Sequence, residues 1–188
     1  MFQTDQNLRF QIAACRLRCH SIKGQTMKEF GRASATIRYF GEMFIAPLIA
    51  VALFAKSPLG WTESAMVASA GAAIWTLAEY AFHRFVLHHY APTRHGAHHA
   101  DPGEPILSIF WQIWVCFAVV YLIAGGAFLA GSLTAYAWYL FVHHSAHHSP
   151  DRLPAFLIRN HQGHHKLASR NFGVTTPLWD HVFRTALR

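Results

Sequence analysis

Long apolar runs constrain the fold of this chain more than any other feature, because a helix needs roughly 20 consecutive apolar residues to cross the bilayer core. Of the 188 residues, 53% are hydrophobic and 13% are charged. A soluble domain carries about twice that share of charge. Four apolar runs predict membrane helices, at about 37–55, from about 62 towards 83, at about 105–124 and at about 133–142.

The breaks between these runs predict where the helices end. Residues 56–60 contain the Pro and Gly that end the first run, and Thr62 is a candidate N-cap for the second helix. Gly125-Gly126, with Gly131-Ser132, indicates a tight return between the third and fourth runs. The fourth run is too short to cross alone and must use the histidine-bearing stretch that follows it. The last two runs could instead form a re-entrant hairpin.

Positive charge is distributed unevenly around these runs. All 16 Lys and Arg residues except Lys56 lie before or at the start of the first run, after the second or after the fourth. Because Lys and Arg accumulate in cytoplasmic loops, both termini are predicted to be cytoplasmic. The formal net charge of +7 then indicates orientation and attraction to anionic lipid, and no interleaving of basic and aromatic residues indicates nucleic-acid binding.

Residues 1–36 are basic and lack the apolar core of a signal peptide. We expect them to form an N-terminal segment that lies on the membrane surface or is disordered. Nothing in the remaining sequence marks a linker, so residues 37–188 are expected to form one membrane domain.

Histidine is concentrated in the second half of the chain, where 14 of the 15 histidines lie between His83 and His181. Imidazole binds first-row metals as a neutral donor, and the repeated clusters therefore predict a metal site. The clusters follow the second and fourth runs, so an out-and-back pair of helices between them would bring all of them to one face. The predicted fold is an all-α integral membrane protein with about four transmembrane helices and a cytoplasmic histidine-rich helical cap.

Spacing within the clusters selects the side chains that face inward. Residues three and four apart share a helix face. The histidines at 95, 98 and 99 could therefore bind one ion, and those at 161, 164 and 165 could bind another. Two pairs on the fourth run are four residues apart, and only one pair can face inward: His143 with His147, or His144 with His148. The outward pair would not bind metal and would at most contact the ligands from outside the site. His83 and His88 are five apart, about 140° around an α-helix, which fits ligands for two ions or a helix that ends between them.

Ten inward imidazoles suit two ions. The predicted ligands are His83, His88, His95, His98, His99, His143, His147, His161, His164 and His165. His20, His89 and His181 are interpreted as surface or hydrogen-bonded residues. Glu79 lies one turn before His83 and could orient an imidazole or pair with Arg84, and Asp180 could orient a ligand or pair with Arg184.

From about Glu79 to Thr185 the chain resembles the membrane fatty acid hydroxylase and sterol desaturase superfamily, whose members are histidine-box di-metal oxygenases. The tail is most similar to the fatty acid 2-hydroxylase branch. The motifs are His83-Arg-Phe-Val-Leu-His88, His95-Gly-Ala-His-His99, His143 through His147, His161-Gln-Gly-His-His165 and Asn171-Phe-Gly-Val-Thr-Thr-Pro-Leu-Trp-Asp180-His-Val-Phe183.

Three departures concern the substrate branch. Only six residues separate His88 from His95, which is more similar to the beta-carotene hydroxylase branch. Leu140 stands where the fatty acid branch tends to have an aspartate, three residues before His143. After Leu-Trp-Asp the family often reads Phe-Gly-Thr, and this chain has Phe183-Arg-Thr.

The resemblance implies an O2-dependent non-haem di-iron oxidoreductase that hydroxylates a C–H bond of a lipid from the bilayer, with a fatty acyl chain preferred. A carotenoid hydroxylase or sterol-type oxidase is the alternative. Residues 1–36 are too short for a fused cytochrome, so a separate donor is expected, a ferredoxin or b-type cytochrome with a reductase. Zinc would also bind imidazoles but has no redox chemistry. A non-redox metal-binding or transport protein is a distant alternative, because a transporter would place such groups at mid-membrane.

Overall fold

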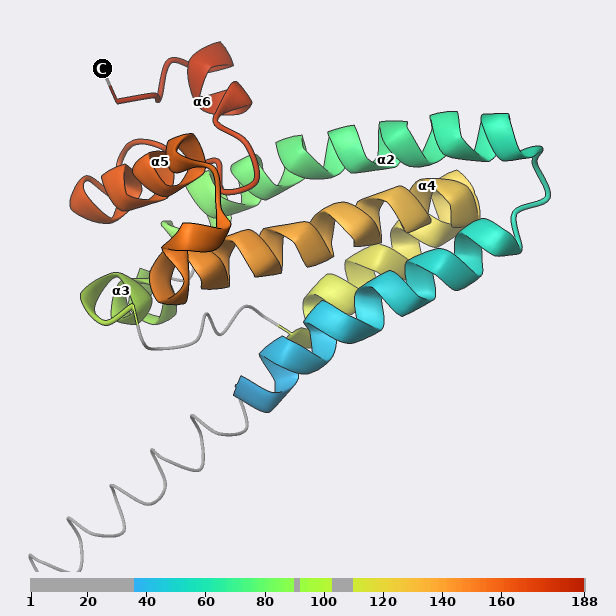
Figure 1. Cartoon of the computed structure of the whole chain (residues 1–188), viewed down its shortest axis with the longest axis horizontal. Coiled ribbons are helices and arrows are strands. Elements are labelled where there is room, and N and C mark those ends of the chain that lie inside the picture. The colour runs from blue at the N-terminus through green and yellow to red at the C-terminus, as the bar shows by residue number, and fades with distance from the viewer. Residues whose placement is uncertain (1–35, 90–91, 103–109, 188) are drawn as a thin grey trace, which may run out of the picture. The chain divides into compact units, whose positions relative to one another are not determined.

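The computed structural model describes residues 36–89, 92–102 and 110–187, and within them it is built from helices without a β-strand (Figure 1). The all-α prediction is confirmed. Three helices in the described part are long and apolar enough to span a membrane: Thr36–Ala55, Trp61–Leu87 and Trp111–His148. The predicted N-terminal segment, with His20, lies outside the described residues except for Thr36.

The second of these helices begins one residue earlier than the sequence indicated. Helix α2 spans Trp61–Ala81 and its N-cap is Gly60 rather than Thr62, whose selection was wrong. The Gly60 N–H donates to the carboxylate of Glu63 at 3.1 Å, which satisfies a backbone donor at the helix start. A π-helix, Phe82–Leu87, continues α2 towards the histidine clusters.

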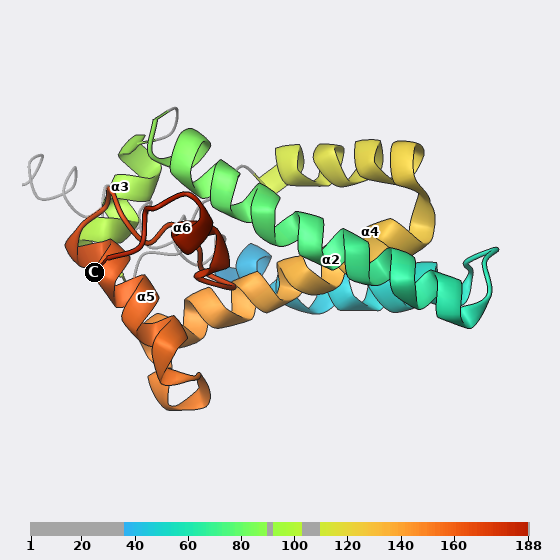
Figure 2. The same ribbon diagram turned by 90° about the horizontal axis from the view of Figure 1, so that it is seen from above.

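The predicted third and fourth runs form one hairpin, α4, which spans Phe110–His148 (Figure 2). The chain reverses at Gly125, whose φ of 80° and ψ of 177° interrupt the helix and favour glycine. Gly131 and Ser132 lie inside the returning arm, so their assignment to the turn was wrong. The described part of the outgoing arm rises about 22 Å, so it fits a re-entrant hairpin as well as a crossing.

Two glycines let α2 and the returning arm of α4 touch through their backbones. A Cβ atom at Gly131 would lie 1.7 Å from the carbonyl oxygen of Ala68, and one at Gly71 would lie 2.1 Å from that of Phe128. Ser132 Oγ adds a hydrogen bond to the Gly71 carbonyl at 3.2 Å. Small residues at a helix crossing allow close packing in a bilayer, where apolar side chains gain little from leaving lipid.

The core between the long helices is apolar, and so are their outer faces. A buried cluster that includes Ala46, Phe117, Leu133 and Tyr136 joins the first helix to both arms of α4. Leu122 and Ile123 on the outgoing arm are each 81% exposed. Apolar helices with unburied apolar faces are suited to lipid, which agrees with the predicted membrane protein.

The short helices gather at the end of the bundle where the π-helix and α4 end (Figures 1 and 2). They are α3 (Pro92–Ala100), a 3-10 turn (Pro150–Arg152), α5 (Ala155–Lys166) and α6 (Leu178–Val182). This end forms the histidine-rich helical cap that the sequence predicted. Its cytoplasmic orientation stays a prediction.

Candidate metal centre

The structure brings the ten predicted ligands together in two groups. Within each group, one nitrogen of every imidazole lies within 4.8 Å of those of the other members. The first group is His83, His88, His95, His99 and His164; the second is His98, His143, His147, His161 and His165. Each group draws side chains from three helical segments, of which at least one is distant in sequence from the others, so tertiary packing assembles both.

Helix α3 lies across both groups rather than serving one ion, which corrects the expected three-histidine face. His95 and His99, four residues apart, differ by about 40° around the helix and belong to the first group. His98 lies about 100° from His99 around the helix and belongs to the second group. The spacing therefore divides the cluster between two neighbouring centres.

Helix α5 repeats this division with the groups exchanged. His161 and His165 belong to the second group, and His164 belongs to the first. His161 and His164 are almost fully buried, whereas His165 is partly exposed. Together α3 and α5 fix the two groups beside one another.

The π-helix explains how His83 and His88 reach the same group although an α-helix would turn them about 140° apart. The backbone N–H of His88 donates to the carbonyl of His83 at 3.4 Å, an i to i+5 hydrogen bond. In that geometry, residues five apart lie nearly above one another, and the two ring centroids are 5.2 Å apart. Of the two interpretations of this pair from the sequence, the helix end agrees with the structure, because the π-helix ends at Leu87. Ligation of two different ions is wrong, because both rings belong to the first group.

On the returning arm of α4, His143 and His147 face the groups. His144 and His148 stack on each other, with ring centroids 4.6 Å apart, and His144 contacts the Phe40 ring on the first helix at 5.0 Å. The outward pair is therefore turned towards another part of the bundle.

Backbone carbonyls fix the tautomers of two imidazoles. His83 Nδ1 donates to the Phe172 carbonyl at 2.6 Å, and His164 Nδ1 donates to the Arg170 carbonyl at 2.7 Å. A neutral imidazole carries one N–H, so both side chains direct the Nε2 lone pair into the first group. Such hydrogen bonds are typical of metal-binding histidines.

The first group contains more facing lone pairs than protons can satisfy. Nε2 of His95 lies 2.9 Å from Nε2 of His83 and 3.0 Å from Nε2 of His99, while Nε2 of His88 lies 3.1 Å from Nε2 of His164. Among the described residues, the buried Nδ1 atoms of His95 and His99 have no hydrogen-bond partner. A cation among the five nitrogens would accept these lone pairs.

The second group has the same character. Nε2 of His143 lies 2.9 Å from Nε2 of His98, and Nε2 of His161 lies 2.7 Å from Nε2 of His147. Both ring nitrogens of His165 are buried without a hydrogen-bond partner in the part of the chain that the structure describes. An all-imidazole donor set is suited to first-row metals, so these residues fit a second ion.

Burial makes protonation of these rings unfavourable. Burial, followed by the neighbouring imidazole of His99, lowers the pKa of His95 to about 2. Burial likewise lowers the pKa of His164 to about 3 and of His165 to about 3. The rings are therefore neutral at neutral pH, the form that binds a metal.

Glu79 and Asp180 act on the loop behind the histidines rather than on an imidazole, and neither makes the alternative pair with an arginine. Glu79 accepts hydrogen bonds from the backbone N–H of Val174 at 2.7 Å and from the Thr175 hydroxyl. Asp180 accepts from the N–H of Phe172 at 2.7 Å. The two carboxylates hold the loop whose carbonyl orients His83.

Two asparagines that the sequence reasoning missed complete this support. Asn160 Nδ2 donates to the Gly173 carbonyl at 2.7 Å. Asn171 has a φ of 55°, and its side chain binds the Asn160 carbonyl at 3.1 Å and the Leu187 N–H at 2.7 Å. Asn171 begins the family-like tail, and Asn160 precedes a predicted ligand, so both positions carried a signal. His89 and His181 are exposed, as expected.

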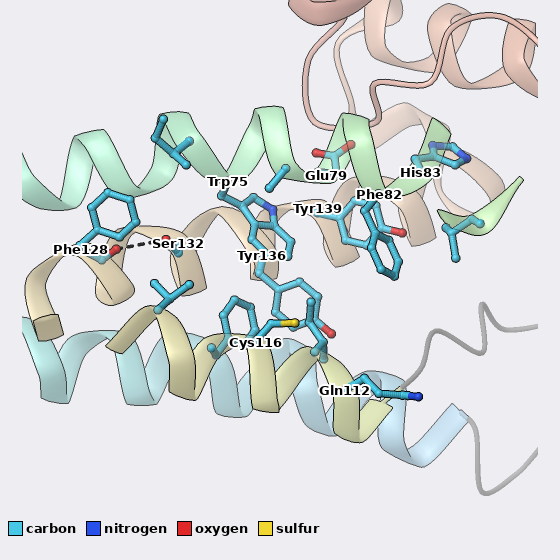
Figure 3. A pocket seen from close by; sticks show the side chains of 16 residues that line it. Trp75, Glu79, Phe82, His83, Gln112, Cys116, Phe128, Ser132, Tyr136 and Tyr139 are labelled. Atoms are coloured by element: carbon cyan, nitrogen blue, oxygen red, sulfur yellow. Dashed lines mark hydrogen bonds between the residues drawn. The ribbon is translucent and has the colours of Figure 1, made fainter. Parts of the chain in front are cut away.

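An apolar cavity of about 250 Å³ lies between α2 and the arms of α4 and reaches His83 (Figure 3). Trp75, Phe128 and Tyr136 line it within the bundle, and Phe82 and His83 line it near the histidine groups. Two buried polar atoms in its wall, Trp75 Nε1 and Gln112 Oε1, have no hydrogen-bond partner within residues 36–89, 92–102 and 110–187. The cavity offers an elongated apolar group a path to the first group.

The fatty acid hydroxylase family model matches residues 68–185. The chain is 29% identical over 157 residues to dihydroceramide fatty acyl 2-hydroxylase FAH2 of Arabidopsis thaliana, covering 72% of this chain and 66% of that protein. It is 34% identical over 145 residues to ceramide very long chain fatty acid hydroxylase SCS7 of Saccharomyces cerevisiae, covering 62% and 37%. Rattus norvegicus fatty acid 2-hydroxylase is 30% identical over 142 residues, with 62% and 38% covered.

A solved structure described as full-length scs7p with only the hydroxylase domain visible has a TM-score of 0.63 and 26% sequence identity, covering 82% of this chain and 66% of that chain. The chain thus spans from 37% to 66% of the length of these relatives. Because the family model covers more than half of the sequence and includes all ten clustered histidines, this chain belongs to the fatty acid hydroxylase family.

Proposed function

We propose that this protein is a membrane-bound dinuclear-metal oxygenase that hydroxylates a C–H bond of a fatty acyl chain. The overall reaction would be R–H + O2 + 2 e⁻ + 2 H⁺ → R–OH + H2O. The observation that carries the proposal is the apolar cavity that ends on His83, a member of the first histidine group. The relatives whose printed names specify fatty acyl hydroxylation support the substrate class.

The ten histidines would be the metal ligands, five to each ion. Two iron ions, when bound, would supply the activation of O2 and the oxidation of the C–H bond. Zinc could bind the same imidazoles but has no redox chemistry. Glu79, Asp180 and the Phe172 carbonyl keep His83 oriented, so their contribution is to hold the site in shape.

The cavity would bind the acyl chain and exclude water from the reacting carbon. Its walls are mainly aromatic and aliphatic side chains from α2 and both arms of α4. Trp75 and Phe117 pack with ring centroids 5.4 Å apart, and Trp75 and Tyr136 pack at 5.2 Å. These rings form a fixed wall, so chain length and the position of the chain end would decide which carbon lies nearest His83.

In this proposal the protein is a multi-pass membrane protein with both termini and the histidine groups on the cytoplasmic side, as the distribution of Lys and Arg indicates. The two electrons would come from a separate carrier protein, a ferredoxin or b-type cytochrome with its reductase.

Lipid analysis of host cells with and without the protein tests the function. We expect a lipid that gains one oxygen atom in mass, and its loss in a His161→Ala variant. His148→Ala, a change at an exposed histidine outside both groups, should retain the product. An oxygenated carotenoid or sterol in place of an oxygenated acyl chain would refute the substrate class. No oxygenated product in metal-replete cells would refute the oxygenase.

A further inference from the structure

An exposed basic hollow lies beside the metal centre. Building on the proposed function, we propose that this hollow is the docking site of an acidic one-electron carrier protein. The lining of this hollow, named the tail hollow, includes Leu167 and Arg170 just after α5, His181 in α6, and Arg184 and Leu187 after α6. All five side chains are exposed.

The charge of the tail hollow is positive at its surface. Arg170 and Arg184 are exposed, and Lys166 at the end of α5 is exposed nearby. The acidic residue of the lining, Asp180, is completely buried, and its carboxylate accepts hydrogen bonds from backbone and side-chain donors beneath the hollow. A surface with exposed cations and no exposed lining carboxylate is complementary to an acidic partner and would steer its approach.

One hydrogen bond joins the tail hollow to the first histidine group. The backbone carbonyl of Arg170 accepts the Nδ1–H of His164 at 2.7 Å, and Nε2 of the same imidazole belongs to the group. The Arg170 side chain in turn donates to the Arg184 carbonyl at 2.8 Å, which ties the two sides of the hollow together. A carrier bound in the tail hollow would therefore contact Arg170, and the Arg170 carbonyl is hydrogen-bonded to the candidate metal ligand His164.

The size and composition of the tail hollow suit a transient redox partner. Electron-transfer encounters are small compared with stable interfaces, and the hollow combines two exposed leucines, Leu167 and Leu187, with the arginines. Each docking event would deliver one electron and leave the carrier oxidised by one electron. Two events per O2, with two protons from water, balance the hydroxylation.

The test uses the full chain in neutral detergent, an acidic plant-type ferredoxin as the probe, and the variant Arg184→Glu. Arg184 is selected because its side chain lies in the hollow. Its backbone is in the left-handed region at φ 57°, and arginine and glutamate both carry a Cβ atom there, so the exchange changes the charge and not the backbone. The matched control is Lys56→Glu, an exposed cation in the loop between the first helix and α2. Ferredoxin binding is measured by fluorescence anisotropy, and hydroxylation is measured with reduced ferredoxin and, separately, with dithionite.

We expect Arg184→Glu to weaken ferredoxin binding about tenfold at low salt and to flatten its salt dependence. Ferredoxin-driven hydroxylation should fall similarly, while dithionite-driven hydroxylation and metal content stay unchanged, and Lys56→Glu should match the wild type. Unchanged binding in Arg184→Glu would overturn the docking site, as would a wild type that turns over with dithionite but does not bind ferredoxin.

A defect of Arg184→Glu that is confined to nanodiscs with anionic lipid, and absent in neutral detergent, would assign the tail hollow to lipid headgroups and overturn the carrier proposal. Failure of the wild type to hydroxylate with dithionite is a separate outcome. It would refute the proposed oxygenase function, whereas the binding measurement would still decide whether the hollow recognises an acidic protein.

Discussion

Replacing Asp180 by Asn should weaken metal binding through the loop that orients His83. One Asp180 oxygen accepts hydrogen bonds from the Phe172 N–H at 2.7 Å and from Thr185 Oγ1 at 2.8 Å, and the other accepts from the Gly173 N–H at 2.9 Å. Asparagine keeps the shape but changes one acceptor into an NH2 donor. In either orientation, that donor faces a backbone N–H.

The magnitude follows from that conflict. A buried N–H left without an acceptor costs about 1–3 kcal/mol, and hydrogen bonds to a charged group contribute about 1.5–3 kcal/mol each. Asparagine is neutral, so the variant no longer bears the free-energy cost of burying the Asp180 charge, and this gain offsets part of the loss. We therefore expect a net destabilisation of about 2–4 kcal/mol. Displacement of Phe172 would also loosen the hydrogen bond from His83, and loss of such a support typically lowers metal affinity about 10–100-fold.

Thermal unfolding in detergent and competition with a metal chelator measure the two effects. The matched control is Asp151→Asn, which makes the same chemical change at an exposed position in the 3-10 turn. It should alter stability by less than about 0.5 kcal/mol and leave metal affinity unchanged. If Asp180→Asn resisted the chelator as well as the wild type does, the loop would not support the metal centre and the reasoning would be refuted.

Three further predictions address the ligands, the helix contact and the cavity. His147→Ala should lower the metal content per chain, whereas His148→Ala should not, because only His147 belongs to a group; equal metal content by elemental analysis would contradict this. Gly131→Val should cost at least about 3 kcal/mol of stability, since its Cβ would lie 1.7 Å from a carbonyl of α2, whereas Gly41→Ala, which meets nothing within 4 Å, should be tolerated in thermal unfolding. Ala78→Phe should partly fill the cavity and shift the products towards shorter acyl chains in lipid mass spectrometry, and an unchanged chain-length profile would exclude this cavity as the acyl site.

Helical periodicity identified the histidines that the structure brings together, but it did not identify which of them belong to the same group. Three- and four-residue spacing indicated that 95, 98 and 99 are inward, and all three are in a group. The division of His98 from His95 and His99 was missed, because a single helix face about 100° wide can touch one centre or two. What lies opposite that face depends on α4 and α5, which are distant in sequence.

The π-helical geometry at His83 and His88 was missed for a local reason. The sequence reasoning used α-helical geometry, and the structure has a π-helix over Phe82–Leu87. A helix of this type is favoured only where tertiary contacts require its geometry, since the α-helical alternative has better local hydrogen bonding. The position of both rings in the first group provides such a requirement.

The sequence by itself determined the helical membrane class, the clustering of histidine at one end of the helices and eight of the ten inward imidazoles, because hydropathy and helical periodicity are local properties. It left open which pair on α4, His143 with His147 or His144 with His148, faces inward. Only the tertiary structure decided which imidazoles share a centre, where the apolar cavity reaches the site and how Glu79 and Asp180 hold the loop. The carboxylate of Glu79 binds residues about 95 positions away. No local pattern encodes such a contact, because it exists only when packed helices bring the two segments together.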